Sequence, residues 1–351
     1  MNYFININRR FYHRKQLFLY IVADMLLIWG AYLFYCTNSY YKAFLSPEAV
    51  ITLFYVSVYF SSISIFSVFK NRNRKDFKSN GYIFWNTFIK GLWYLCIRKE
   101  QKQVPFFANK NDKTIVLFSI VKLFFIPIMI NFAIRNFNDF SSEINHIQSI
   151  SINNSWMEIL NNVIYPFTIS LFFLVDTVLF AFGYLFESSF LKNRIRSVDA
   201  TWGGWIAALL CYPPINEVLS KIAPLESSTF VLFENTEQTF LARLTMIILL
   251  FFYVSASVSL GSKCSNLTNR GIVTKGAYSF VRHPAYISKV LFWWITIIPV
   301  MKNSPIIIIT MLVWTFVYFI RAVTEERHLS MDDDYIKYCK IVKYRFIPFI
   351  Y

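Results

Sequence analysis

The residues best suited to chemistry in this chain of 351 residues lie in two polar clusters near its C-terminal end. The first runs from Gly276 to Tyr286 and reads Gly-Ala-Tyr-Ser-Phe-Val-Arg-His-Pro-Ala-Tyr, and the second is Glu325-Glu326. Arginine, histidine and glutamate can bind both charges of a polar ligand, and tyrosine rings can stack on it. Pro284 suits the first turn of a helix, where the neighbouring backbone N–H groups stay free to bind a ligand. The two clusters predict one ligand site if the fold brings them together.

Two apolar segments, residues 285–301 and 305–323, lie between these clusters. Each is close to the length of about 17–25 residues that a membrane-spanning helix needs. Two spanning helices joined by a tight turn return to the membrane face from which they started. We therefore expect a helical hairpin whose outer ends hold both clusters at one face.

The composition indicates an all-α, polytopic integral membrane protein. Hydrophobic residues make up 56% of the chain and aromatic residues 20%, and the mean hydropathy is +0.43. Charged residues make up 16%, against about 25% in soluble proteins. Long apolar blocks predict about eight spanning helices. These blocks are residues 17–36, 50–69, 114–134, 163–186, 202–222, 239–260, 285–301 and 305–323.

The net charge of +15 comes from Lys and Arg in alternate loops between the apolar blocks. Such an excess marks the cytoplasmic side of a membrane protein and favours contact with anionic lipid over nucleic acid. It predicts that both termini and the first polar cluster are cytoplasmic. The five cysteines are scattered, without a CxxC pair, so we expect no disulfide framework and no metal site.

One apolar segment, residues 81–97, has basic residues on both sides and Lys90 in its middle. A further crossing here would invert every later loop and place the basic motif loop outside. We therefore expect an interfacial helix that lies in the membrane plane.

The block at residues 202–222 contains the pair Pro213-Pro214. Proline removes a backbone donor, which a membrane helix tolerates only where protein or water satisfies the freed groups. One reading is a broken helix that lines a substrate cavity. The other, slightly favoured, is a packed kink or a short helix followed by a turn.

Asp24, Lys122 and Asp176 are the clearest ionisable residues inside predicted spans. A structural ion pair between Lys122 and one of the aspartates is the favoured interpretation, and a proton or ion path is the alternative. Lys289 lies near a helix end, from which its amine can reach water.

Five short motifs follow one another in the last part of the chain: Gly276-x-Tyr278, Val281-Arg282-His283-Pro284-x-Tyr286, Glu325-Glu326-x-x-Leu329, Tyr335-x-x-Tyr338 and Arg345-Phe346-Ile347-Pro348. In order and spacing they resemble the isoprenylcysteine carboxyl methyltransferase family and its phospholipid methyltransferase relatives. The resemblance covers about residues 239–351 and leaves 1–238 as membrane helices of unassigned role. It implies an enzyme that binds S-adenosylmethionine at the cytoplasmic face and methylates a lipophilic acceptor entering from the bilayer.

Methyl transfer from a sulfonium is an in-line displacement that needs alignment and water exclusion rather than a nucleophilic side chain. We expect Arg282 or Arg270 to neutralise an acidic acceptor and Glu325 to take the proton of an amine acceptor. These three are the candidate catalytic residues. The cofactor contacts implied by the resemblance are Gly276, Tyr278, Val281, His283, Pro284, Tyr286 and Glu326.

The chain departs from the family pattern at two places. Ser288 stands where the family usually has glycine, with Lys289 after it, and residues 265–271 replace a histidine-rich approach. Both changes concern the acceptor more than the cofactor. Membrane reductases of the steroid type share a similar C-terminal pattern and bind NADPH, so a reductase is the alternative function. A transporter or a non-catalytic scaffold is the third.

Overall fold

The computed structural model describes residues 2–74, 76–96, 109–148, 155–224, 228–301, 304–348 and 350. Over these residues the chain is mainly α-helical. Two strands of two residues each, β1 (Ser197–Val198) and β2 (Thr268–Asn269), pair antiparallel. Seven helical segments in the described ranges are long and apolar enough to cross a membrane. The predicted all-α, polytopic architecture is confirmed.

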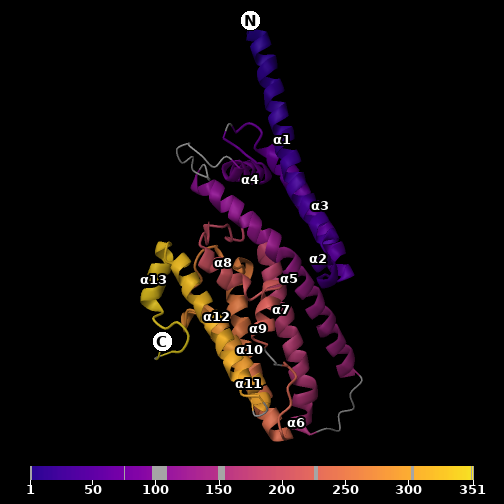
Figure 1. Cartoon of the computed structure of the whole chain (residues 1–351), viewed down its shortest axis with the longest axis vertical. Helices are drawn as coiled ribbons and strands as arrows, with labels where there is room; N and C mark the ends of the chain where they lie inside the picture. The colour runs from indigo at the N-terminus through magenta and orange to yellow at the C-terminus, as the bar shows by residue number, and fades with distance from the viewer. Residues whose placement is uncertain are drawn as a thin grey trace. The chain divides into compact units, whose positions relative to one another are not determined.

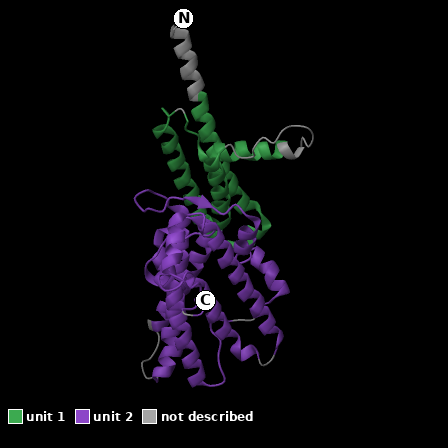
Figure 2. Ribbon diagram, turned by 90° about the vertical axis from the view of Figure 1, so that its left-hand side faces the viewer, with its two compact units in different colours: residues 1–127 green, residues 128–351 purple. Residues whose placement is uncertain are grey.

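The chain divides into two compact units, residues 1–127 and 128–351 (Figure 2). The boundary falls inside α5, at Pro127, where the helix lacks one backbone donor. The predicted functional division between residues 238 and 239 lies within the second unit and stays a prediction. The first unit contains α1 (Asn2–Thr37), α2 (Ser39–Phe44), α3 (Pro47–Lys70), α4 (Asn80–Cys96) and the beginning of α5 (Lys110–Gln148).

The second unit contains the rest of α5 and the elements that build the site. They are α6 (Trp156–Ile159), the π-helix η1 (Leu160–Ile164), α7 (Tyr165–Leu185), α8 (Trp202–Leu209), α9 (Ile215–Ile222), α10 (Thr236–Leu260), the 3-10 turns η2 (Gly261–Lys263) and η3 (Gly276–Ser279), α11 (Pro284–Met301), α12 (Ile306–Leu329) and α13 (Asp333–Ile341). Figure 1 shows their arrangement.

In the first unit, α4 packs against α1 and runs crosswise to it (Figures 1 and 2). The carboxylate of Asp24 accepts hydrogen bonds from the Ser64 hydroxyl and, at 2.6 Å, from the backbone N–H of Gly81. Lys122 lies over the rings of Phe60 and Phe118. The crosswise helix favours the predicted interfacial reading, whose last residue, 97, lies outside the described ranges.

The predicted ion pair between Lys122 and an aspartate is wrong. Asp24 takes the neutral donors just named. In the second unit, Asp176 accepts hydrogen bonds from the hydroxyls of Tyr253 at 2.7 Å and Ser257 at 2.5 Å. Neutral donors satisfy a buried carboxylate without a second desolvated charge, which explains why these hydroxyls lie opposite it.

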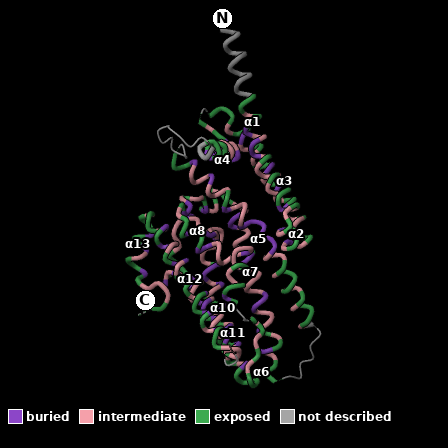
Figure 3. Tube along the Cα trace, viewed as in Figure 1, coloured by how far each residue is buried: buried purple, intermediate pink, exposed green. Residues whose placement is uncertain are grey.

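Helices α7 and α10 run parallel and pack against each other. Tyr165 at the start of α7 contacts Met246, and Gly183 near its end packs directly on the backbone of Cys264. A core of Tyr165, Ile169, Met246, Leu250 and Phe292 ties α7 and α10 to α11. Buried and exposed positions alternate along these helices (Figure 3), as expected where one side of each helix faces lipid.

The α11–α12 hairpin forms as predicted. Its two helices share a core of Val290, Ile297, Ile307, Met311 and Tyr318. Its outer ends, the start of α11 and the end of α12, lie together because the chain reverses between them. The hairpin therefore brings the two polar clusters of the sequence to one end of the second unit.

The block at residues 202–222, predicted to be one spanning helix, is instead two helices of eight residues each, α8 and α9. They are separated at Pro213-Pro214, because neither proline has an N–H group to donate within a helix. This block therefore adds no helix to the seven that are long enough to span.

The chain nevertheless returns across the second unit through this broken segment. Thr201 contacts Arg327 near the end of α12, and the indole N–H of Trp314, midway along α12, donates to the Ala223 carbonyl at 3.1 Å. At the other end of the unit, the hydroxyl of Tyr165 donates to the carbonyl of Thr229 at 2.5 Å. A helix–break–helix–coil passage thus reconnects the parallel helices α7 and α10.

Candidate functional site

A cavity opens in the second unit where the hairpin ends meet α8, α10 and the loop before η3. Its walls combine aromatic rings, cations and the carboxylates of Asp199 and Glu325. Predicted site residues that line it are Tyr278, Arg282, His283, Tyr286 and Glu325.

The first polar cluster is held in place by the C-terminal segment of the chain. The backbone N–H groups of Arg282 and His283 donate to the carbonyls of Tyr344 and Arg345 at 3.0 and 2.9 Å. Pro284 follows as the first residue of α11, as predicted. This pairing explains why the Arg-Phe-Ile-Pro motif, about 60 residues further along the chain, belongs to the same site.

Glu326 is the centre of a buried ion network. Its carboxylate lies 3.3 Å from Nη1 of Arg282, 3.1 Å from Nε2 of His283 and 2.9 Å from Nε of Arg345. The side chain of Glu326 is 10% exposed, and that of His283 is 5% exposed. Three basic partners from two segments converge on this carboxylate, so the geometry gives Glu326 a positioning role.

Arg282 belongs to this ion network and also donates to two backbone carbonyls. Besides Glu326, it donates from Nε to the Val342 carbonyl at 2.9 Å and from Nη2 to the Lys343 carbonyl at 2.8 Å. A guanidinium has five N–H donors in a fixed fork, and these bonds use both of its arms and its Nε. Arg282 therefore fastens the C-terminal segment to the start of α11.

Glu325 and Tyr286, in contrast, face the cavity. The Tyr286 hydroxyl donates to Oε2 of Glu325 at 2.5 Å, and the Tyr286 ring stacks on His283 with centroids 5.3 Å apart. The second oxygen of Glu325 remains available to a ligand. Burial, reinforced by the negative charge of Glu325, raises the pKa of Tyr278 well above its ordinary value. Tyr278 is therefore a neutral hydroxyl at any physiological pH.

Three other predicted residues lie behind the cavity wall. Gly276 adopts a φ of +65°, and a Cβ there would meet the Ser259 hydroxyl at 2.2 Å, so this turn requires glycine. Val281 is buried and accepts a hydrogen bond from Tyr338. Arg270 is 3% exposed and donates to the cavity-lining Ser265 and to the Asn193 carbonyl, each at 2.9 Å, without lining the cavity itself. The structure does not bring Arg270 together with Arg282 and Glu325.

Two cations that the sequence did not assign to the site line the cavity deeper along the hairpin. Arg321 donates from Nη2 to Oδ1 of Asn266 at 2.5 Å, and its guanidinium lies 5.0 Å from the ring centroid of Tyr286. Nζ of Lys289 lies 5.2 Å from the Trp293 ring centroid, and Lys289 lines the cavity. A charge inside a predicted span was the signal that would have found both residues.

The break between α8 and α9 also contributes to the cavity. Tyr212, directly before the proline pair, and Ala208 and Gly204 of α8 form one wall. Gly204 packs so closely on Asp199 that a Cβ would lie 1.9 Å from a carboxylate oxygen. Of the two readings of this block, the structure supports the broken helix that lines a cavity.

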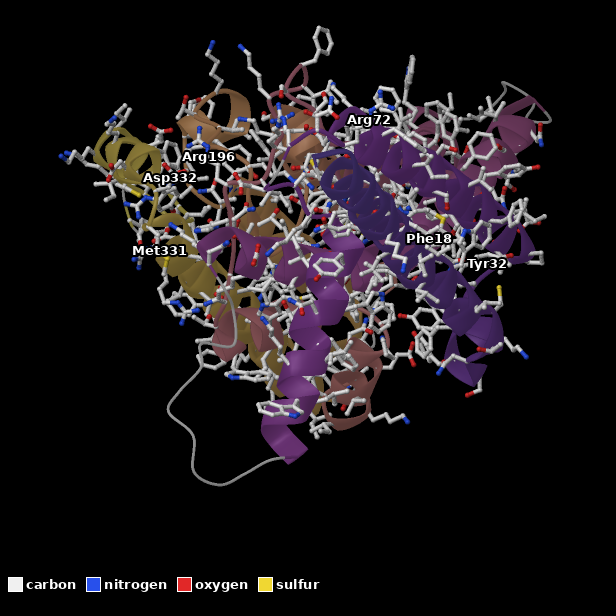
Figure 4. All side chains as sticks on the ribbon, turned by 90° about the horizontal axis from the view of Figure 1, so that it is seen from above. Phe18, Tyr32, Arg72, Arg196, Met331 and Asp332 are labelled. Carbon is white, nitrogen blue, oxygen red and sulfur yellow. The ribbon has the colours of Figure 1, made fainter. Side chains whose placement is uncertain are left out.

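A cluster of ion pairs lies next to the end of α12. Arg196 lies 2.8 Å from Asp332 and 2.7 Å from Asp334, and Asn269 donates to Asp332 at 2.8 Å (Figure 4). The acidic turn at residues 332–334 thus ties the start of α13 to β1 and β2. Within the described ranges, no three His, Cys, Asp or Glu side chains are grouped as a metal site.

Comparison with known proteins identifies the region around this cavity. Residues 237–332 match the family model described as Phospholipid methyltransferase. No curated protein and no solved structure matches the chain. The matched stretch runs from the start of α10 to the start of α13 and includes both polar clusters, which confirms the suspected family for the C-terminal region. Residues 237–332 of the second unit are thus similar to the phospholipid methyltransferase family.

Proposed function

We propose that this chain is an integral-membrane, S-adenosylmethionine-dependent methyltransferase that acts on a lipophilic acceptor. The observation that carries the proposal is the coincidence of the family match with the cavity. Tyr278, His283, Tyr286 and Glu325 lie within the matched residues and line the cavity. The surrounding apolar helices give a bilayer-soluble acceptor a route to that cavity.

The side chains of the cavity suit this cofactor. S-adenosylmethionine supplies an electrophilic methyl group on a positively charged sulfonium. The free oxygen of Glu325 can hold a cationic group, and the rings of Tyr278 and Tyr286 can pack on adenine or beside the sulfonium. The sequence assigned the cofactor to Glu326, but three basic partners already surround that carboxylate. We therefore assign the cofactor's cationic groups to Glu325.

The chain's own residues have three tasks in such a reaction. The Glu326 network fixes the start of α11, so that Tyr286 and Glu325 hold their positions. The aromatic walls exclude water from the reacting atoms. An acceptor with a carboxylate or phosphate oxygen needs no base, whereas the proton of an amine acceptor would pass to Glu325.

The partners of Arg282 argue against the reductase alternative at the outer end of the cavity. NADPH carries a 2′-phosphate, for which proteins commonly use arginine. Arg282, at the outer end of the cavity, is engaged by Glu326 and two carbonyls. The basic loops on this side of the unit support a cytoplasmic position for the site, where a soluble cofactor has access.

Isothermal titration of the purified chain in detergent tests the cofactor assignment. We expect S-adenosylmethionine to bind the wild type and Glu325→Gln to weaken binding by about tenfold, because a charged hydrogen-bond partner is lost. Glu237→Gln is the control, since Glu237 is exposed at the far end of α10. Binding of NADPH in place of S-adenosylmethionine would overturn the proposal and support a reductase.

A further inference from the structure

The inner end of the cavity holds two cations without an anionic partner. Arg321 is 8% exposed, and Lys289 is half-buried. Among the residues that the structure describes, no carboxylate oxygen lies within 4.0 Å of either side chain's nitrogens. Buried charges in proteins are normally paired, because a lone charge loses its hydration without compensation. These two cations therefore point to a missing anion.

Aromatic rings surround both cations instead. The guanidinium carbon of Arg321 lies 5.5 Å from the ring centroid of Tyr212 and 5.9 Å from that of Tyr318. Nζ of Lys289 lies 5.8 Å from the Tyr253 centroid and 5.7 Å from that of Tyr318. Tyr318 is shared, so the two cations lie on neighbouring parts of one wall. Ring faces attract a cation but carry no net negative charge, so they leave its positive charge without a counterion.

The carboxylates nearest to this wall have other partners. Asp176 accepts the hydroxyls of Tyr253 and Ser257, and Glu325 accepts the hydroxyl of Tyr286. Asp199, also at the cavity, accepts a hydrogen bond from the Thr201 hydroxyl at 2.7 Å. The field of Asp176 reaches Lys289, but its oxygens lie beyond ion-pair distance from the ammonium. The protein itself thus leaves the positive charge of this wall partly uncompensated.

The two cations also lie deeper than the rest of the polar site. Lys289 is three residues, about one helical turn, further into α11 than Tyr286, and Arg321 is four residues further into α12 than Glu325. The cavity is therefore polarised along the hairpin. Its outer end carries the carboxylate of Glu325, and its inner end carries two cations at membrane depth.

We propose that the inner end of the cavity binds an anionic group, a carboxylate or a phosphate, between Lys289 and Arg321, and that this group belongs to the lipophilic acceptor. The assignment rests on the proposed function and specifies its substrate class as an acidic lipid. A cation at membrane depth meets a headgroup that enters from the bilayer, whereas Glu325 at the outer end suits a positively charged sulfonium.

Lipid binding to the detergent-purified chain tests this inference, with dioleoyl phosphatidic acid as the anionic probe and dioleoyl phosphatidylcholine as its zwitterionic counterpart. Retention in native mass spectrometry gives the ratio of their affinities. We expect Lys289→Met to reduce the preference for phosphatidic acid by about tenfold and Lys289→Arg to keep it. Lys337→Met is the matched control, because Lys337 is 74% exposed on α13 and away from the cavity.

Arg321→Lys provides a second test that keeps the charge but removes the planar fork. We expect a partial loss of preference, smaller than that of Lys289→Met, with unfolding temperature unchanged. Equal preference in the wild type, Lys289→Met and Lys337→Met would overturn the proposal, because the anionic lipid would then bind the general basic surface.

Titration of S-adenosylmethionine into the same variants separates the two sources of an anion. Unchanged cofactor affinity in Lys289→Met supports the acceptor. If Lys289→Met lowers the affinity for S-adenosylmethionine and leaves the lipid preference unchanged, that assignment is overturned. The cations would then bind the carboxylate of the cofactor. If the wild type binds no S-adenosylmethionine, the proposed function fails, while the lipid preference still decides whether the inner end is an anion site.

Discussion

We expect the same substitution, Glu→Gln, to destabilise the protein much more at Glu326 than at the adjacent Glu325. Glu326→Gln removes the charge on which Arg282, His283 and Arg345 converge. Breaking one side of a buried ion pair typically destabilises a protein by about 3–5 kcal/mol. Because the Arg345 side chain is 33% exposed and can turn to water, we expect the lower end, about 3 kcal/mol.

Glu325→Gln should behave differently. The glutamine oxygen can still accept the Tyr286 hydroxyl, so one hydrogen bond is weakened rather than lost, at a cost of about 1 kcal/mol. Equilibrium unfolding in mixed micelles measures both variants. Limited trypsin digestion gives an independent readout. Lys343 is exposed, but Arg282 holds its backbone carbonyl, so Glu326→Gln should loosen the C-terminal segment and speed cleavage after Lys343. The reasoning is refuted if Glu325→Gln is the more destabilised variant or if both leave cleavage at Lys343 unchanged.

Two further predictions concern the packing of the second unit and its outer ion cluster. Gly183→Ala should destabilise the protein strongly, because a Cβ would lie 1.9 Å from the backbone oxygen of Cys264. In the control Gly30→Ala, the added Cβ meets nothing within 4 Å, and this variant should be neutral or more stable by up to about 1 kcal/mol. Comparable unfolding temperatures of the two variants would contradict this packing. Partial burial raises the pKa of Asp332, but hydrogen bonds led by Arg196 outweigh it and hold the pKa below its ordinary value. That stability is present above the unfolded value of about 3.9 and is lost as the pH falls through the folded value. Arg196→Ala should therefore reduce the stability that is lost on acidification by only about 0.2–1 kcal/mol, since Arg196 is half exposed. The unfolding temperature measured against pH checks this, and a profile unchanged at acid pH would argue against the pair.

The sequence predicted the hairpin and the meeting of its ends, because apolar blocks of spanning length restrict the chain to a few topologies. Pro284 at the start of α11 and the polar character of both clusters followed from local chemistry. Local chemistry did not predict the partners of Glu326, because Arg345 lies in a segment without regular structure. Adjacent glutamates on a helix point in different directions, and only the neighbours show which one faces the cavity.

The broken passage at residues 202–222 shows a different limit. Its length and apolar character match a spanning helix, and hydropathy does not register the backbone donors that Pro213 and Pro214 lack. The cavity wall built by Tyr212 depends on that break. The sequence also did not assign Lys289 and Arg321 to the cavity. A cation near a helix end can reach water or turn inward, and its direction depends on rings contributed by other helices.

Transfer of an isotopically labelled methyl group tests the central claim most directly. The purified chain is incubated with methyl-labelled S-adenosylmethionine and a membrane lipid extract, and the lipids are then analysed by mass spectrometry. The account predicts label in an acidic lipid, lost in Glu325→Gln and retained in Glu237→Gln. An extract without labelled lipid, from a wild type that also binds no S-adenosylmethionine, would contradict it.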